Sequence, residues 1–284
     1  MNIQWFPGHM SKTKRLLSEN LKMVDVVIEL LDARIPVSSK NPEIDNIVNN
    51  KPKIIVLNKS DLADEKVSDI WKKWYSSKGY TSIFVNSING SGIKQLKSKM
   101  RDIMKDRIKK DRERGRIFRP VKAMIVGVPN VGKSSLINKI AGKGRTSTGD
   151  RPGVTRGKQW INVNNEIQLL DTPGILWPKF EDERVGINLA ITGAIKDNIL
   201  DITELASALF EILSKDYPEY LTKRYKLGEI EDKSGLDILK EAGKKRGCII
   251  SGGEIDMMRI SAIVLDEFRG AKIGKISLEK PEDN

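Results

Sequence analysis

The chain has 284 residues, 39% of them hydrophobic, and a formal net charge of +12 from 50 Lys and Arg against 38 Asp and Glu. This length allows one well-packed domain and a smaller second one. No apolar run approaches the roughly 20 residues of a membrane helix, and the N-terminus lacks the plan of a signal peptide. The single Cys248 excludes an internal disulfide and is expected to be a buried core residue. These features predict a cytoplasmic protein without a membrane partner.

The N-terminal part of the chain alternates between predicted helices and strands. Residues 10–23 carry leucines at the spacing of a short amphipathic helix. The apolar runs Val26–Leu31, Ile54–Leu57 and Ile83–Val85 are typical of buried parallel strands. From Gly92 onward the apolar residues again follow helical spacing, with Lys and Arg on the other face.

The middle of the chain continues this alternation. Ala123–Val126 is predicted to be a strand, and a helix is expected from Ser134 through Ile140. Gln159–Val163 and Glu166–Leu170 are predicted to pair as a hairpin with Asn164-Asn165 at its turn.

After Asp171 no further strand is predicted. Residues 184–267 are compatible with helices, broken near Gly228, Gly243 and Gly252-Gly253. The pattern predicts an α/β domain with a doubly wound, mostly parallel sheet over residues 1–178, followed by a smaller all-helical domain over residues 179–284. Residues 175–196 would connect the two.

One segment matches a phosphate-binding loop. The residues Gly127-Val128-Pro129-Asn130-Val131-Gly132-Lys133-Ser134 fit the pattern G-x-x-x-x-G-K-[ST], between a predicted strand and a predicted helix. Lys133 is expected to bridge the β- and γ-phosphates and the Ser134 hydroxyl to bind Mg²⁺. The predicted phosphate-binding residues are Gly127, Pro129, Asn130, Val131, Gly132, Lys133, Ser134, Ser135 and Gly174.

Two further segments suit the γ-phosphate and the metal ion. In Asp171-Thr172-Pro173-Gly174, Asp171 is expected to contribute to the Mg²⁺ shell and the Gly174 N–H to meet the γ-phosphate. Thr155 is expected to add a Mg²⁺ ligand only when a nucleoside triphosphate is bound. The predicted metal ligands are therefore Ser134, Thr155 and Asp171.

The base is predicted from Asn58-Lys59-Ser60-Asp61. The Asp61 carboxylate can accept hydrogen bonds from guanine N1–H and the 2-amino group, which adenine lacks. Asn86-Ser87-Ile88 resembles a loop that supports the guanine carbonyl, with Ile88 where alanine is usual. GTP and GDP, rather than ATP, are the expected ligands.

The guanine motif precedes the phosphate loop, the reverse of a Ras-like GTPase, and this order resembles the circularly permuted GTPases. Trp5-Phe6-Pro7-Gly8-His9-Met10, Asp32-Ala33-Arg34-Ile35-Pro36 and the tail from Arg246 to Asp256 are similar to the YlqF/YawG branch. The resemblance implies a circularly permuted Ras-like P-loop GTPase domain and a C-terminal domain that binds RNA or the ribosome. It also implies late maturation of the large (50S) ribosomal subunit, with hydrolysis coupled to release.

Catalysis is expected to be slow without a partner. Ile175 stands where many GTPases carry a glutamine that orients water, so ribosomal particles are expected to stimulate turnover. The resemblance suggests a catalytic role for His9, beside Lys133, Thr155 and Gly174; alternatively, His9 only shapes the entry to the first helix. By analogy Asn130 would help to hold K⁺, or it makes a simple loop hydrogen bond. Arg151 and Arg156 suit either an arginine finger or RNA contact.

The positive charge is concentrated between Lys94 and Arg119, where 12 basic residues accompany 4 acidic ones, a local excess of +8. This favours a polyanionic partner, and the resemblance makes it ribosomal RNA; the alternative is a solvated helix face. Further candidates for phosphate contact are Lys244, Lys245, Arg246, Arg259, Arg269, Lys272 and Lys275, and candidates for base stacking are Trp5, Trp160 and Trp177.

DNA is not an expected partner, and a monomer is expected. Two other functions stay open: a GTPase of tRNA modification, and a nucleotide-gated RNA-binding switch not specific to the large subunit.

Overall fold

The computed structural model describes residues 10–48, 51–115, 120–142, 159–164, 166–172, 174, 176–177, 180, 182–197 and 200–281. They form two compact units. A sheet unit contains the described residues of 10–61, 65–177 and 279–281, and a helical unit contains those of 62–64 and 180–278. The chain therefore passes between the units after Asp61, after Asp64 and after Leu278, as well as between residues 177 and 180.

The sheet has six strands in the order β3-β2-β1-β4-β6-β5. Their bounds are β1 (Val26–Asp32), β2 (Lys53–Asn58), β3 (Ser82–Phe84), β4 (Val121–Val126), β5 (Gln159–Asn164) and β6 (Ile167–Asp171). All neighbouring pairs are parallel except β5 and β6, which form the antiparallel hairpin. Every residue of β1 is buried, as expected for a central strand covered on both faces.

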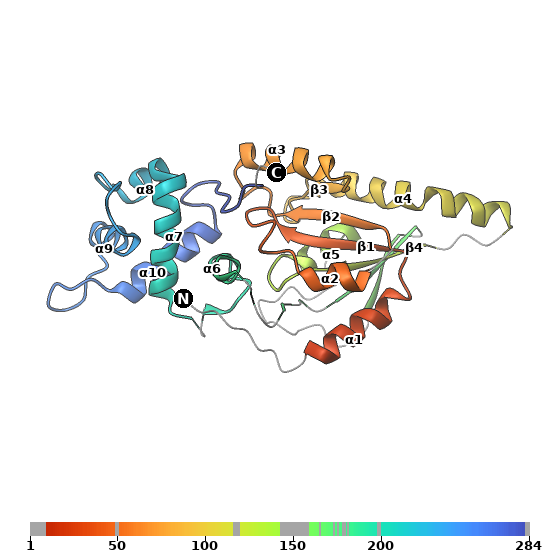
Figure 1. Cartoon of the computed structure of the whole chain (residues 1–284), viewed down its shortest axis with the longest axis horizontal. Helices are drawn as coiled ribbons and strands as arrows, with labels where there is room; N and C mark the ends of the chain where they lie inside the picture. Colours follow the sequence, from red (N-terminus) through yellow and green to blue (C-terminus); the bar gives the residue numbers. More distant parts are fainter. Residues whose placement is uncertain are drawn as a thin grey trace. The chain divides into compact units, whose positions relative to one another are not determined.

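Helices cover both faces of this sheet. The helices of the sheet unit are α1 (Met10–Leu21), α2 (Pro42–Val48), α3 (Glu65–Ser77), α4 (Ile93–Glu113) and α5 (Lys133–Ala141). Leucines of α1 and Ile44 of α2 pack in one apolar cluster with Val27 and Met124 of the central strands. In Figure 1, α1 and α2 lie in front of the sheet and α5 lies behind it, while α4 runs on past the strands.

The helical unit contains α6 (Glu183–Ile191), α7 (Ile202–Asp216), α8 (Pro218–Tyr225), α9 (Gly235–Lys245) and α10 (Met257–Arg269). Four of these helices begin at a side chain that caps backbone N–H groups, as the sequence pattern favours. The caps are Asp182, Asp201, Ser234 and Asp256. The core includes Leu205, Phe210 and Phe268, and Cys248 is buried and free as predicted.

These observations confirm the predicted fold class: a mostly parallel six-stranded sheet and a helical C-terminal part. The break predicted near Gly243 falls just after it, because α9 runs through Gly243 and ends at Lys245. A Cβ at Gly243 would lie 2.7 Å from the Cγ2 of Ile255, so this glycine permits close packing rather than ending the helix. Within the described residues, no helix is long and apolar enough to cross a membrane.

Candidate nucleotide site

The predicted nucleotide motifs lie at one edge of the sheet. Asn58 ends β2, Asn86 follows β3, Gly127 follows β4 and Asp171 ends β6. These strands are mutually parallel, so their carboxyl ends meet at the same edge. Ligands of open α/β sheets bind outside this edge.

The phosphate loop connects β4 to α5, and two of its glycines are required by close contacts. A Cβ at Gly127 would lie 2.5 Å from the Leu30 carbonyl oxygen of β1. Gly132 has φ +100°, and its Cβ would lie 2.4 Å from the Asn58 side-chain amide. Asn130 has a positive φ of 55°, a conformation that asparagine adopts more readily than most residues.

Lys133 begins α5 and points back into the loop. Its Nζ donates hydrogen bonds to the carbonyl oxygens of Gly127 at 3.0 Å and Val128 at 2.8 Å. Burial lowers the pKa of the Lys133 ammonium to about 8, although the charge of the Asp171 carboxylate acts in the opposite direction. The loop thus holds a buried cation whose charge a phosphate group can neutralise.

The segment after β6 lies against this loop. Thr172 is buried, and its hydroxyl donates a 2.5 Å hydrogen bond to the Ile125 carbonyl oxygen of β4. A Cβ at Gly174 would lie 2.8 Å from the backbone of Pro129 and 2.9 Å from the Lys133 Nζ. Any side chain at residue 174 would therefore collide with the phosphate loop.

Asn58 joins the guanine motif to the phosphate loop. Its buried side-chain amide donates a 2.8 Å hydrogen bond to the Val131 carbonyl oxygen. Its side-chain oxygen accepts a 3.1 Å hydrogen bond from the Ser87 backbone N–H. One asparagine thus connects three motifs that lie far apart in the sequence.

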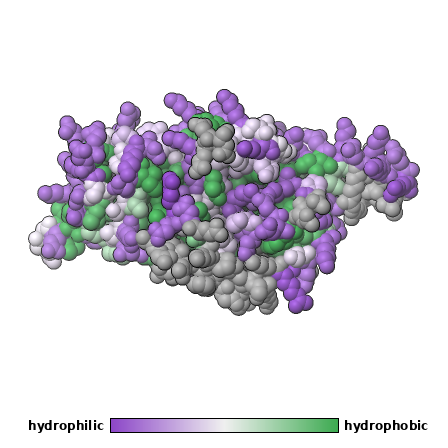
Figure 2. Space-filling view, viewed as in Figure 1, coloured by the Kyte–Doolittle hydropathy of each residue, from purple (hydrophilic) through white to green (hydrophobic). Residues whose placement is uncertain are grey.

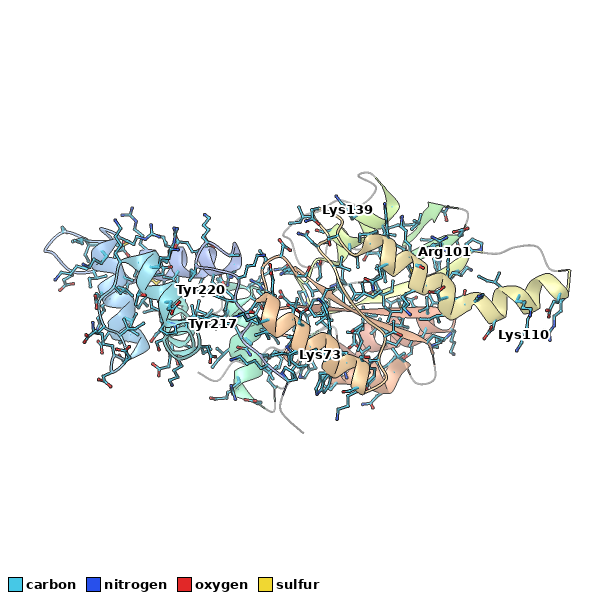
Figure 3. All side chains as sticks on the ribbon, turned by 90° about the horizontal axis from the view of Figure 1, so that it is seen from above. Lys73, Arg101, Lys110, Lys139, Tyr217 and Tyr220 are labelled. Carbon is cyan, nitrogen blue, oxygen red and sulfur yellow. The ribbon has the colours of Figure 1, made fainter. Side chains whose placement is uncertain are left out.

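The loop after β3 is held from two directions. The Asn86 side-chain oxygen accepts the backbone N–H groups of Ile88 at 2.8 Å and Asn89 at 3.0 Å. The Nζ of Lys139, on α5, donates a 2.6 Å hydrogen bond to the Ile88 carbonyl oxygen. The Ile88 side chain itself is 79% exposed. Lys139, labelled in Figure 3, was not predicted, because a lone basic residue in a helix carries no motif.

A buried ion cluster behind the guanine motif was also not predicted. The Asp32 carboxylate accepts hydrogen bonds from the Arg34 guanidinium at 2.8 and 3.0 Å, and the Lys59 Nζ lies 3.1 Å from Asp32 Oδ2. Burial would raise the pKa of Asp32, but the charges of Arg34 and Lys59 hold it well below its usual value. Asp61 is partly exposed at the end of the same motif.

Several predicted residues lie outside the described part of the chain: Trp5, His9, Arg151, Thr155, Arg156 and Ile175. The phosphate-loop residues, Ser134 and Ser135 among them, are described, as are the guanine-motif residues, Asp171 and Gly174. Among the described residues, no group of three or more His, Cys, Asp or Glu side chains could hold a metal ion. A magnesium ion held through one carboxylate, a hydroxyl and nucleotide phosphates needs no such group.

Some predicted RNA contacts are engaged inside the helical unit instead. Arg246 donates to the Glu267 carboxylate at 2.7 Å, and Arg269 donates to Asp197 at 2.7 Å and to the Ile191 carbonyl oxygen. Trp177 is buried, 8% exposed, which does not suit base stacking. The backbones of Lys244, Lys245, Arg259, Lys272 and Lys275 are described, and all five residues are exposed.

The comparisons with known proteins agree with this geometry. A family model for a 50S ribosome-binding GTPase matches residues 122–237. Ribosome biogenesis GTPase A of Bacillus licheniformis is 49% identical over 283 residues, covering 100% of both chains. The Thermotoga maritima protein of the same name is 32% identical over 281 residues, covering 99% of this chain and 95% of its own.

Two solved structures are similar along nearly the whole chain. A GDP-bound structure of YlqF has a TM-score of 0.70 at 28% identity and covers 95% of this chain and 100% of its own. A GNP-bound YlqF from T. maritima has a TM-score of 0.68 at 27% identity, covering 96% and 100%. These relatives confirm the resemblance to the circularly permuted YlqF branch. The chain belongs to the ribosome biogenesis GTPase A family and is a GTPase.

Proposed function

We propose that this chain is a GTP-hydrolysing assembly factor that acts in late maturation of the large (50S) ribosomal subunit, with hydrolysis coupled to its release. The observation that carries the nucleotide part of the proposal is the pair of hydrogen bonds made by the Asn58 side chain. One goes to Val131 of the phosphate loop and the other to Ser87 of the base loop. The names of the relatives supply the ribosomal context.

In this proposal guanine is read by Asp61, with Asn58, Lys59, Asn86, Ser87 and Ile88 forming the rest of the base site. The phosphates are bound by residues 127 and 129–135, in which backbone N–H groups and the start of α5 favour negative charge. Pro129 has no N–H to give, so its part is steric. Gly174 contacts the γ-phosphate, and Lys133 releases its two loop carbonyls to meet the β- and γ-phosphates.

Magnesium fits the donor set: Ser134 at the start of α5, the buried carboxylate of Asp171, and Thr155. When bound, the ion would neutralise charge on the β- and γ-phosphate oxygens. By analogy with related GTPases, we assign Asn130 of the phosphate loop to a second cation, K⁺. His9 is proposed to act on the attacking water or on the developing charge, since Ile175 can do neither.

The RNA partner is proposed to meet α4. Lys94, Arg101, Lys105 and Lys109 recur every four or seven residues and so share one side of this helix, and all four are exposed. Asp102, Asp106 and Glu113 recur at the same spacing on the adjoining side. The end of α4 projects past the sheet in Figure 1 and is hydrophilic in Figure 2, while Figure 3 labels Arg101 and Lys110 along it. Arg101 also lies 3.7 Å from the Glu166 carboxylate, and the remaining exposed lysines of this side suit an RNA backbone.

The helical unit, which ends at Leu278 rather than at residue 284, is proposed to supply further contacts to the ribosomal particle. The test is co-sedimentation of the protein with immature 50S particles, mature 50S subunits and 30S subunits, with GDP or a non-hydrolysable GTP analogue. We expect binding to immature 50S particles with the analogue only, and faster GTP turnover in their presence. Equal binding to every RNA-containing particle would favour an RNA switch without subunit specificity. Binding to tRNA in a parallel filter assay, with none to these particles, would favour a role in tRNA modification. The protein is proposed to work as a monomer in the cytoplasm.

A further inference from the structure

The guanine motif is held in place by a buried carboxylate. Lys59, its second residue, has φ +57°, an uncommon conformation for lysine, and its ammonium lies 3.1 Å from Asp32 Oδ2. Asp32 is 2% exposed and also forms the two-pronged pair with Arg34. The position of Lys59 therefore depends on where the chain places Asp32.

Asp32 is placed in turn by the loop that follows it. Its backbone N–H donates a 3.0 Å hydrogen bond to the hydroxyl oxygen of Ser39, and that hydroxyl donates to the Ile35 carbonyl oxygen at 2.6 Å. Ser39 is fully buried. Residues 32–39 thus form a closed loop whose two ends are joined by a side chain.

The outer part of this loop is bound by a residue from far along the chain. The Glu279 carboxylate accepts the backbone N–H of Val37 at 2.6 Å and of Ser38 at 3.0 Å, and it also accepts the Ser38 hydroxyl. The backbone oxygen of Glu279 accepts the Trp71 indole N–H at 3.1 Å, which fixes its position on α3. Glu279 belongs to the sheet unit, directly after Leu278, the last residue of the helical unit.

We propose that Glu279 is a positioning residue for guanine recognition. Its charge-assisted hydrogen bonds fix the loop at Val37 and Ser38, the loop fixes Asp32, and Asp32 holds the Lys59 ammonium in the base site. Each step in this series is a hydrogen bond, an ion pair or the peptide bond between Ser38 and Ser39, and the series ends on Lys59 of the proposed base site. The inference rests on the proposed guanine site.

The test uses the full-length protein and compares GDP with inorganic pyrophosphate, which engages only the phosphate loop. Glu279→Ala is expected to weaken GDP binding about tenfold and to leave pyrophosphate binding unchanged. Glu279→Gln, which keeps one acceptor oxygen, should give an intermediate loss. Glu231→Ala, at an exposed acidic residue of the helical unit, is the matched control and should bind GDP like the parent protein. An equal loss for GDP and pyrophosphate, or no loss for GDP, overturns the proposal.

A double-mutant cycle separates positioning from general stabilisation. If Glu279 acts through Lys59, Glu279→Ala should weaken GDP binding no further once Lys59→Ala is present. Additive losses would show that Glu279 acts by another route and would reject the inference. If neither Lys59→Ala nor Asp61→Ala affects GDP binding, the guanine site itself is wrong. That outcome differs from a failure of Glu279 alone.

Discussion

Asn58 and Val131 are 73 positions apart in the sequence, yet the Asn58 amide donates a 2.8 Å hydrogen bond to the Val131 carbonyl oxygen. Gly132, the next residue, has φ +100°, and a Cβ there would lie 2.4 Å from the same amide nitrogen. The guanine motif and the phosphate loop are packed so closely at this point that only a hydrogen atom fits at residue 132.

Gly132→Ala should therefore weaken GDP binding more than tenfold and lower the free energy of unfolding by about 2–4 kcal/mol, from backbone strain and collision together. Gly142→Ala at the other end of α5 is the matched control. Gly142 has φ +78° but no atom within 4 Å of an added Cβ. It should lose only about 1 kcal/mol and keep its GDP affinity. Calorimetric titration and denaturant unfolding measure both effects; similar losses in the two variants would contradict the packing argument.

Asp61→Asn should move the preference from guanine to xanthine nucleotides. The new amide presents a donor where guanine also donates, whereas xanthine presents a carbonyl oxygen. We expect at least a hundredfold fall in GDP affinity and a gain for xanthosine diphosphate. Asp69→Asn, at an exposed residue of α3 paired with Lys72, is the control and should leave both affinities unchanged. Retained guanine preference in Asp61→Asn would remove Asp61 from the base site.

Lys133 predicts a pH dependence. In the nucleotide-free protein, burial lowers the pKa of Lys133 from its ordinary value of 10.5 to about 8. Bound phosphates should raise this pKa again. GDP affinity should then be constant below pH 8 and fall up to about tenfold per unit above it, because the amine, uncharged in the free protein at that pH, must take up a proton when the nucleotide binds. Lys133→Gln should lack this fall, which separates it from titration of the nucleotide itself. A parent protein with the same pH profile as Lys133→Gln would refute the assignment.

The same shift affects the stability of the nucleotide-free protein. The unfolded chain binds a proton at Lys133 up to a higher pH than the folded chain does. This group therefore destabilises the folded state below pH 8, and the destabilisation is lost as the pH rises from 8 to 10.5. Denaturant unfolding measures the free energy of unfolding across this pH window. This free energy should rise more steeply with pH in the parent protein than in Lys133→Gln.

His9→Ala should lower GTP turnover about a hundredfold, both alone and with immature 50S particles, while GTP affinity changes less than twofold. The reason is that the imidazole is asked to act only in the transition state. Single-turnover hydrolysis with saturating protein measures the first quantity and equilibrium titration the second. A collapse of GTP affinity would assign His9 a structural role instead.

The basic side of α4 should govern salt-dependent binding to immature 50S particles. Lys105→Gln with Lys109→Gln removes two exposed charges from that side and should flatten the slope of log affinity against log salt by about two. Lys99→Gln with Lys110→Gln is the matched control: the same charge is lost from the same helix, on a different side. Filter binding across a salt series measures both slopes. Equal slopes for the two double variants would mean that α4 contributes only its net charge.

The sequence predicted the parallel strands well because each is a largely apolar run bounded by polar residues, and it predicted which motifs would follow them. β5 is half polar and was predicted from its hairpin with β6 instead. Asn58, Asn86, Gly127 and Asp171 each end or follow a predicted strand. Parallel pairing of those strands is enough to bring the four residues to one edge of the sheet. Helices α2 and α3 were missed. α2 has only 7 residues, but α3 has 13 and carries Val67, Trp71 and Tyr75 at helical spacing, so its signal was present. Asn41, whose side chain accepts the Glu43 N–H before α2, was the available signal.

The contacts of long side chains could not be predicted. The direction of Lys139 toward Ile88, or of Lys59 toward Asp32, depends on which loops the fold brings within reach. Composition likewise could not show that Arg246 and Arg269 pair with acidic residues of their own unit. Such assignments require the packed neighbours, and a residue's type alone does not contain them.

The bond between Glu279 and Val37 spans 242 positions, and the whole helical unit is encoded between the two. During translation the loop beside the guanine motif therefore cannot reach its final form until the helical unit has been synthesised. Domains of most proteins fold in the order in which they emerge. Here the sheet unit, which begins first, is completed only by Glu279, a residue that follows the helical unit in the sequence. Full affinity for guanine nucleotide would thus appear late in synthesis, and a nascent chain that lacks the second unit would bind GTP poorly.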